Sequence, residues 1–120
     1  MVLGDPITLM IIIKLALAHL AAAHVGAGAV VLAIAAVTFI LLTFEEISNW
    51  FADRQALVES DKDNLAFTLQ QKLESGEYST VQGVFNKRTH AIPAARTITS
   101  QRIDAQLADT HAIHELALYN

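Results

Sequence analysis

The sequence predicts a membrane-anchored α+β protein, in which an N-terminal transmembrane helical segment precedes a small α-α-β-β-α-β domain. The main observation is the distribution of charge: residues 7–44 contain one formally charged residue, Lys14, whereas residues 45–120 contain eighteen of the twenty. An apolar run of more than about 18 residues is typical of a transmembrane helix, because roughly 20 helical residues cross a hydrocarbon core of about 30 Å. We therefore expect residues 1–44 to form the anchor.

The apolar run is longer than one crossing needs. As a single helix, its thirty-eight residues would measure about 57 Å. This length favours a helical hairpin of two short crossings, residues 7–23 and 29–44, joined at HVGAG, where the glycines permit a tight turn. The alternative is a single span over residues 22–44. The hairpin is favoured because ITLMIII is too apolar to lie in water, although Lys14 then lies in mid-membrane at a cost of about 2.5–3.5 kcal/mol.

Small residues recur along the apolar run at helical spacing. On a helix, such a stripe lets a second helix approach closely, within a hairpin or between subunits. A general enrichment in alanine would give the same pattern without a packing role. The residues predicted to pack helices are Ala18, Ala22, Gly26, Ala29 and Ala33.

Three ionisable residues, Lys14, His19 and His24, interrupt the apolar run. Ionisable groups inside a membrane are costly and often functional. His19 and His24 are therefore candidate ligands for haem iron or chlorophyll magnesium, and all three are candidates for lining the wet lumen of a pore. Spacings of five residues place successive side chains about 140° apart around a helix, so the three share no face. A structural role without a cofactor is the leading interpretation.

The exit from the membrane is predicted near Phe44. Phe44, Trp50 and Phe51 surround the change from FILLTF to EEISNWF, as an aromatic belt does at a headgroup boundary. Residues 45–60 then predict an amphipathic helix that lies at the membrane interface. The basic residues beyond it favour a cytoplasmic C-terminal domain of an integral membrane protein.

Residues 61–120 predict a small soluble α+β domain. A helix is expected over residues 61–76, where Leu65, Leu69 and Leu73 form a buried stripe at i, i+4 and i+8. EYSTVQGVFN and HAIPAARTITS are rich in β-branched and aromatic residues and predict a β-hairpin. A short helix capped by Ser100 follows over QRIDAQLADTHA, and ELALYN predicts a closing strand.

Charge is segmented within this domain. Residues 78–103 contain bases and no acid, which predicts either a solvated face or a basic surface for anionic headgroups or an acidic partner. Nucleic acid is not expected, because the net charge is −4 and aromatic and basic residues do not interleave. The basic residues are Lys87, Arg88, Arg96 and Arg102.

Motifs for chemistry are sparse. HAIHE lacks the His spacing and the internal glutamate of a HExxH zinc site, so no metal is expected. The sequence contains no nucleophile elbow or phosphate loop, and no cysteine. We therefore expect a protein that is not an enzyme.

Two segments, DKDNLAFTLQQKLESGEYSTVQGVFN and IDAQLADTHAIHELALYN, resemble small uncharacterised membrane-anchored proteins of cyanobacterial type. The resemblance covers about residues 45–120. It implies a location in the plasma or thylakoid membrane of a photosynthetic prokaryote, and it implies no particular activity.

The leading functional hypothesis is an accessory or scaffold subunit that holds its α+β domain at a membrane and binds a larger membrane complex or itself. Its expected partners are the lipid bilayer and a protein of such a complex, or further copies in a homo-oligomer. Two alternatives stay open: a pore-like homo-oligomer lined by Lys14, His19 and His24, and a small subunit that carries chlorophyll or haem.

Overall fold

The computed structural model describes the backbone of residues 6–26 and 35–119, and the side chains of residues 7–19 and 35–119. Four helices and five strands lie in these ranges. Their order is α1 (Pro6–Gly26), β1 (Ala35–Leu42), α2 (Phe44–Ala52), α3 (Gln55–Glu59), β2 (Asn64–Lys72), β3 (Tyr78–Asn86), β4 (Ala94–Ile103), α4 (Ala105–Thr110) and β5 (Leu116–Leu118).

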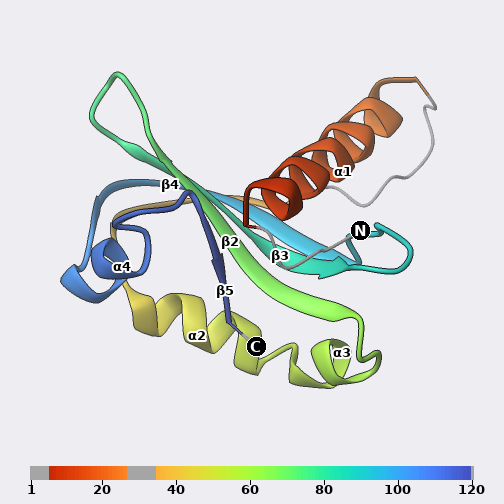
Figure 1. Ribbon diagram of the computed structural model, residues 1–120. Coiled ribbons are helices and arrows are strands. Elements are labelled where there is room, and N and C mark those ends of the chain that lie inside the picture. Colours follow the sequence, from red (N-terminus) through yellow and green to blue (C-terminus); the bar gives the residue numbers. More distant parts are fainter. Residues whose placement is uncertain (1–5, 27–34, 120) are drawn as a thin grey trace.

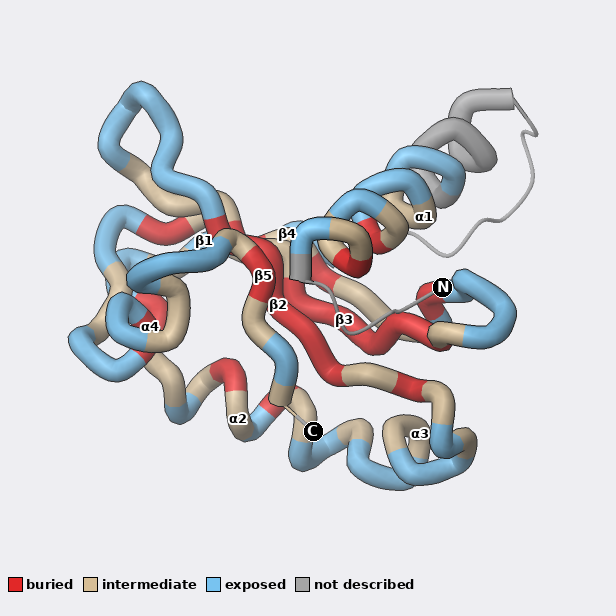
Figure 2. Tube along the Cα trace, in the orientation of Figure 1, coloured by how far each residue is buried: buried red, intermediate tan, exposed pale blue. Residues whose placement is uncertain are grey.

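The five strands form one sheet in the order β1-β4-β3-β2-β5. β1 runs parallel to β4, and the other neighbouring pairs are antiparallel. Helix α1 lies over one face of the sheet, while α2 and α3 lie along the opposite face (Figure 1). The central strands β2 and β3 carry most of the buried residues, and the turn between them is exposed (Figure 2).

The face under α1 is an apolar core. Leu9 and Ile13 of α1 pack against Phe67 of β2 and Phe85 of β3, and all four are buried. Side chains alternate between the two faces of a strand, so the apolar residues at odd positions of β2 and β3 all belong to the core cluster that α1 covers. Gly83 belongs to the same row, where a Cβ atom would lie 2.8 Å from the carbonyl oxygen of Ala94.

The opposite face carries α2, whose start is fixed by two side chains. The hydroxyl of Thr43 accepts a hydrogen bond from the Glu46 amide at 3.1 Å, which is an N-cap. Asp104 accepts from the Phe44 amide at 3.1 Å and from the Leu107 amide at 2.9 Å. One carboxylate thereby joins the first turns of α2 and α4, which are far apart in the sequence.

The predicted membrane anchor is wrong. Its first half forms α1, which buries Leu9 and Ile13 against the sheet, and residues 35–42 of its second half form strand β1. Within the described ranges, no helix combines the length and the apolarity that a membrane span requires. The integral membrane localisation in a plasma or thylakoid membrane, with its cytoplasmic domain, rested on this anchor and is corrected with it.

The predicted order α-α-β-β-α-β is also wrong in part. Residues expected to form a helix over 61–76 form strand β2 and the turn after it. Residues 45–60 are helical, as α2 and α3, but α2 buries Ile47 and Trp50 against the sheet instead of lying on a membrane. Asp104, not Ser100, caps the short helix α4. The hairpin of β3 and β4 and the closing strand β5 are confirmed.

Candidate binding groove

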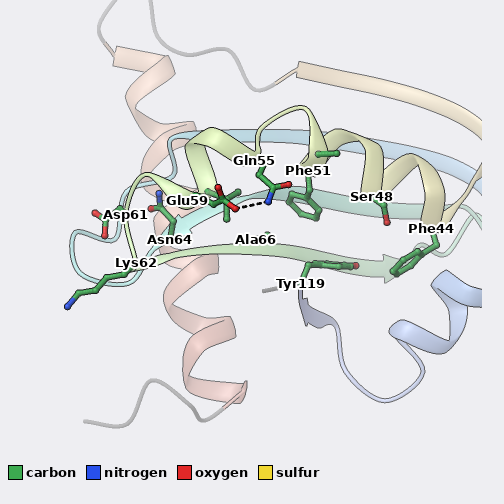
Figure 3. A pocket seen from close by; sticks show the side chains of 12 residues that line it. Phe44, Ser48, Phe51, Gln55, Glu59, Asp61, Lys62, Asn64, Ala66 and Tyr119 are labelled. Atoms are coloured by element: carbon green, nitrogen blue, oxygen red, sulfur yellow. Dashed lines mark hydrogen bonds between the residues drawn. The ribbon is translucent and has the colours of Figure 1, made fainter.

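A groove of about 590 Å³ lies between α2 and α3 on one side and strand β2 and the C-terminal segment on the other. Figure 3 shows that its side chains come from both helices on one side and from the sheet on the other. The lining comprises aromatic, aliphatic, polar and charged groups: Phe44, Ser48, Phe51, Ala52, Gln55, Val58, Glu59, Asp61, Lys62, Asn64, Ala66 and Tyr119.

One end of the groove is aromatic. The ring of Tyr119 lies 5.1 Å from that of Phe51 and 6.2 Å from that of Phe44, centroid to centroid. Phe51 in turn contacts Trp50 edge to face at 5.5 Å. All three lining rings are partly buried, so they expose part of their apolar surface to the groove. This end can accept a flat or branched apolar group.

The other end of the groove is polar. Gln55 donates to the carboxylate of Glu59 at 2.7 Å, across one turn of α3. Asn64, on the floor, is 5% exposed and donates to the carbonyl oxygen of Leu57 at 3.0 Å. In Figure 3 the Gln55–Glu59 pair faces the groove, while Lys62 points away from it. Glu59 is therefore the charged group that a ligand in this end would meet.

Asp61, at the polar rim, belongs to an ion-pair cluster. Arg88 contacts the carboxylates of Asp61 and Asp63, and Asn86 donates to Asp61 at 3.0 Å. The pKa of Asp61 is lowered, chiefly because its carboxylate accepts a backbone hydrogen bond from Asp63, and further because it accepts from Asn86 and Arg88. The cluster ties the loop before β2 to the turn after β3.

A partly buried chain of hydrogen bonds runs behind the aromatic end. The hydroxyl groups of Tyr119 and Thr68 are 2.6 Å apart, and Thr68 lies 2.7 Å from Nε2 of His111. Nδ1 of His111 lies 3.1 Å from the carbonyl oxygen of His114. A carbonyl oxygen only accepts, so in the neutral ring Nδ1 carries the proton and Nε2 accepts from Thr68. Tyr119 then donates to Thr68.

Burial favours the neutral form of the group at each end of this chain. It lowers the pKa of His111 and raises the pKa of Tyr119, because a charged form loses hydration in the interior. Thr68 is fully buried and cannot meet a substrate as a nucleophile. The chain therefore fixes the position of the Tyr119 ring, and with it one wall of the groove.

A second buried polar network holds α2, the other wall. Gln82 of β3 donates to the carbonyl oxygen of Ile47 at 2.9 Å, and Nε of Arg96 donates to Gln82 at 2.8 Å. Nη2 of Arg96 lies 3.3 Å from the carboxylate of Glu46. The guanidinium of Arg96 also lies 5.5 Å from the ring centroid of Trp50. Sheet and helix are thus joined by directional contacts.

The aromatic residues predicted for a headgroup boundary lie at this wall. Trp50 is a buried residue of α2, and Phe44 and Phe51 face the groove. The guanidinium of Arg54 lies 3.8 Å from the ring centroid of Trp50, as in a cation–π contact. The aromatic residues in FEEISNWFA thus contact the protein's own sheet and groove.

The residues singled out in the apolar run do not converge with the groove. Lys14 forms an ion pair with Glu115 at 3.0 Å, which joins α1 to the segment before β5. His19 and Ala18 are exposed on α1. The side chains of His24, Ala22 and Gly26, and residues 29 and 33, lie outside the described residues. Haem or chlorophyll ligation and a pore lining therefore stay predictions.

The four basic residues predicted to share a surface are separated. Arg96 is 7% exposed and points toward α2, Arg88 binds the acids of the β2 loop, and Arg102 is exposed on β4. Lys87 is half-buried in the turn after β3. In the described part of the chain, no cluster of three His, Cys, Asp or Glu residues could hold a metal ion.

Sequence reasoning missed the residues that shape the groove, above all Tyr119, Thr68, Gln55 and Glu59. A signal was present in NLAFTLQ, where the polar residues Asn64, Thr68 and Gln70 lie at even positions and the large apolar residues lie at the odd positions between 64 and 70. Such alternation is typical of a strand with two different faces. It would have placed Asn64 and Thr68 on the face opposite Phe67.

No protein-family model, curated protein or solved structure matches this chain. The resemblance to small membrane-anchored proteins of cyanobacterial type stays a prediction. A function must therefore be inferred from the geometry of the groove.

Proposed function

We propose that the protein is a non-enzymatic accessory protein whose groove binds a short segment of a protein partner. The groove with its aromatic end is the observation that carries this proposal. Its volume of about 590 Å³ falls in the range of about 300–1,000 Å³ typical of ligand sites. Partly buried aromatic rings are also enriched where a few anchor residues supply most of the binding energy of an interface.

The lining defines the chemistry of the bound segment. Phe44, Phe51 and Tyr119 suit one apolar anchor, such as a leucine or an aromatic side chain. Glu59 at the other end suits a neighbouring lysine or arginine, because its charge faces the groove while that of Asp61 is compensated by Arg88. The hydrogen-bond networks behind both walls hold the groove residues in place, which lowers the ordering cost of binding.

Two features favour binding over catalysis. Thr68, Tyr119 and His111 resemble a nucleophile with its base, but the Thr68 hydroxyl is fully buried. The pKa shifts favour the neutral imidazole and the neutral phenol, which suits a structural chain of hydrogen bonds. A role in binding uses the groove as it stands.

The proposal is tested by selecting binders from a phage-displayed library of random linear peptides. Trp50 is the only tryptophan and contacts Phe51 in the groove wall, so its fluorescence reports occupancy without a label. We expect selected peptides to combine an apolar anchor with a nearby base, and to shift the Trp50 emission on titration. Glu59→Gln should weaken binding of the basic peptides severalfold.

A matched pair of variants locates the binding site. Ser48 lines the groove, whereas Asn49, its neighbour on α2, is exposed and does not line it. Ser48→Phe should fill the groove and reduce peptide affinity at least tenfold, and Asn49→Phe should leave it unchanged. Peptides that bind both variants equally, or a library that yields no binder, would overturn the proposal.

A further inference from the structure

The outer edge of the sheet at β1 suggests an interaction that is separate from the groove. We propose that β1 pairs antiparallel with β1 of a second copy of this chain, about a two-fold axis at Thr38, so that two five-stranded sheets become one of ten strands. β1 and the β2–β5 side, where the groove lies, are at opposite ends of the strand order. This inference therefore does not rest on the proposed function.

β1 lacks the usual protections of an edge strand. Its sequence, AAVTFILL, contains no charged residue and no proline. Proteins commonly place such residues on an edge strand to prevent edge-to-edge pairing. Within the described part of the chain, β1 pairs only with β4. Ile40 is 65% exposed and Leu41 42% exposed, so a strand laid beside β1 would also remove apolar surface from water.

The direction of the backbone groups fixes which residues can pair. The carbonyl oxygen of Leu42 accepts from the Asp104 amide at 3.1 Å, so the backbone of Leu42 points toward the β4 side. Successive residues of a strand alternate in this direction. The residues whose amide and carbonyl groups point outward are therefore Ala35, Val37, Phe39 and Leu41.

A two-fold axis at Thr38 pairs these outward groups with one another. Val37 then lies opposite Phe39 of the second copy, and Ala35 opposite Leu41 of the second copy, with about eight hydrogen bonds formed in all. Thr38 lies opposite itself in a close, non-hydrogen-bonded pair, a position where two threonines attract each other. Every described residue from 35 to 41 finds a partner in this register.

Side-chain sizes and charge match this register. Each large residue faces a smaller one across the axis: Ile40 faces Ala36, and Phe39 faces Val37. A strand with no charge can meet its own copy without like charges opposite each other. The same segment serves as both halves of the interface, as an isologous dimer requires. This self-complementarity in size and charge identifies a second copy as the partner.

Cysteine cross-linking tests the register directly, because the chain has no cysteine of its own. Thr38→Cys should form an intermolecular disulfide under mild oxidation, since the Cα atoms of such a pair lie about 4.5 Å apart, within the range that a disulfide spans. Ile40→Cys is the matched control. Its counterpart in the second copy would lie four residues along the strand, about 13 Å away, so it should not cross-link alone, but should cross-link with Ala36→Cys.

The mass in solution tests the association itself. A single strand pair is at the low end of interface sizes, so we expect a dimer at high protein concentration that dissociates on dilution. Sedimentation equilibrium should then approach twice the chain mass of 13.0 kDa. Thr38→Lys puts like charges opposite each other and should give a monomer with an unchanged far-ultraviolet circular dichroism spectrum, because Thr38 is exposed.

Two results would overturn the proposal. One is a monomer for the unmodified protein throughout the concentration series. The other is cross-linking of Ile40→Cys alone as efficiently as Thr38→Cys, which would indicate random encounter or a different register. Both results are independent of whether the groove binds a peptide.

Discussion

The two faces of the sheet are buried by different means. Under α1 the contacts are between apolar side chains, whereas the face under α2 contains most of the buried polar side chains of the sheet. Apolar contacts depend mainly on volume and shape, while buried polar groups also need a partner in the right direction. The polar face thereby positions the helix and the tyrosine that form the groove. Its buried polar residues include Thr68, Thr80, Gln82, Arg96 and Ser100.

The largest effect is expected on the apolar face. Phe67 is fully buried between α1 and the sheet, so Phe67→Ala should lower the free energy of unfolding by about 3–5 kcal/mol through lost burial and a cavity. Urea denaturation followed by circular dichroism measures this change. Leu73→Ala, at a position 39% exposed in the turn after β2, is the control. A similar loss of unfolding free energy in both variants would contradict the distinction between core and surface positions.

The polar face should respond to single and double changes differently. Gln82→Leu removes the acceptor of the Arg96 Nε donor, and the buried donor then costs about 1–3 kcal/mol. Gln82→Leu combined with Arg96→Met removes both partners and should cost less than the sum of the two single variants. A double-mutant cycle by urea denaturation measures the coupling. Strict additivity would show that the two side chains act independently.

Removal of two different hydroxyl groups on this face should change the stability of the protein in different ways. Thr80 accepts from Gln70 at 3.0 Å, so Thr80→Val should destabilise the protein by about 1 kcal/mol. The hydroxyl of Ser100 is buried and has no hydrogen-bond partner among the described residues. Ser100→Ala should therefore leave stability unchanged or raise it by up to about 1 kcal/mol. Destabilisation by Ser100→Ala would point to a partner outside the described residues.

The sequence predicts much of the C-terminal half and little of the N-terminal half. The β3–β4 hairpin follows from β-branched and aromatic residues, which fit a pleated, half-buried surface. The predicted helix over 61–76 failed because a spacing of four satisfies both periods: Leu65, Leu69 and Leu73 share a helix face, and they also share one face of a strand. Phe67, between them, belongs to the strand pattern only.

The membrane anchor was predicted wrongly from the apolar run for a different reason. A helix that is apolar all round lies either in a membrane or in a protein core, and composition alone does not separate these. α1 is intermediate, because Leu9 and Ile13 are buried while Ile7, Ile11 and Leu15 are at least half exposed. The groove was not predictable because Tyr119, Thr68 and His111 are distant in the sequence. Only the pairing of β5 with β2 brings them together.

The smallest expected effect is a change of stability with pH. It tests the hydrogen-bond chain of Tyr119, Thr68 and His111 behind the groove. Burial lowers the pKa of His111 from its ordinary value of 6.5, so the unfolded chain takes up this proton more readily than the folded one. The stabilising contribution is therefore complete above pH 6.5 and decreases as the pH falls below 6.5 toward the lower folded pKa. The ordinary pKa of Asp61, 3.8, lies below this window.

The loss between pH 7.5 and 5.5, measured by thermal unfolding, should shrink in His111→Gln, because glutamine has no proton to gain. His114→Gln is the matched control, since its side chain is exposed and the variant keeps the backbone carbonyl that His111 contacts. If His111→Gln loses as much stability on acidification as His114→Gln, the hydroxyl–imidazole chain does not couple protonation to folding. The polar face would then differ from the apolar face in the geometry of its contacts, and not in how its contribution to stability depends on pH.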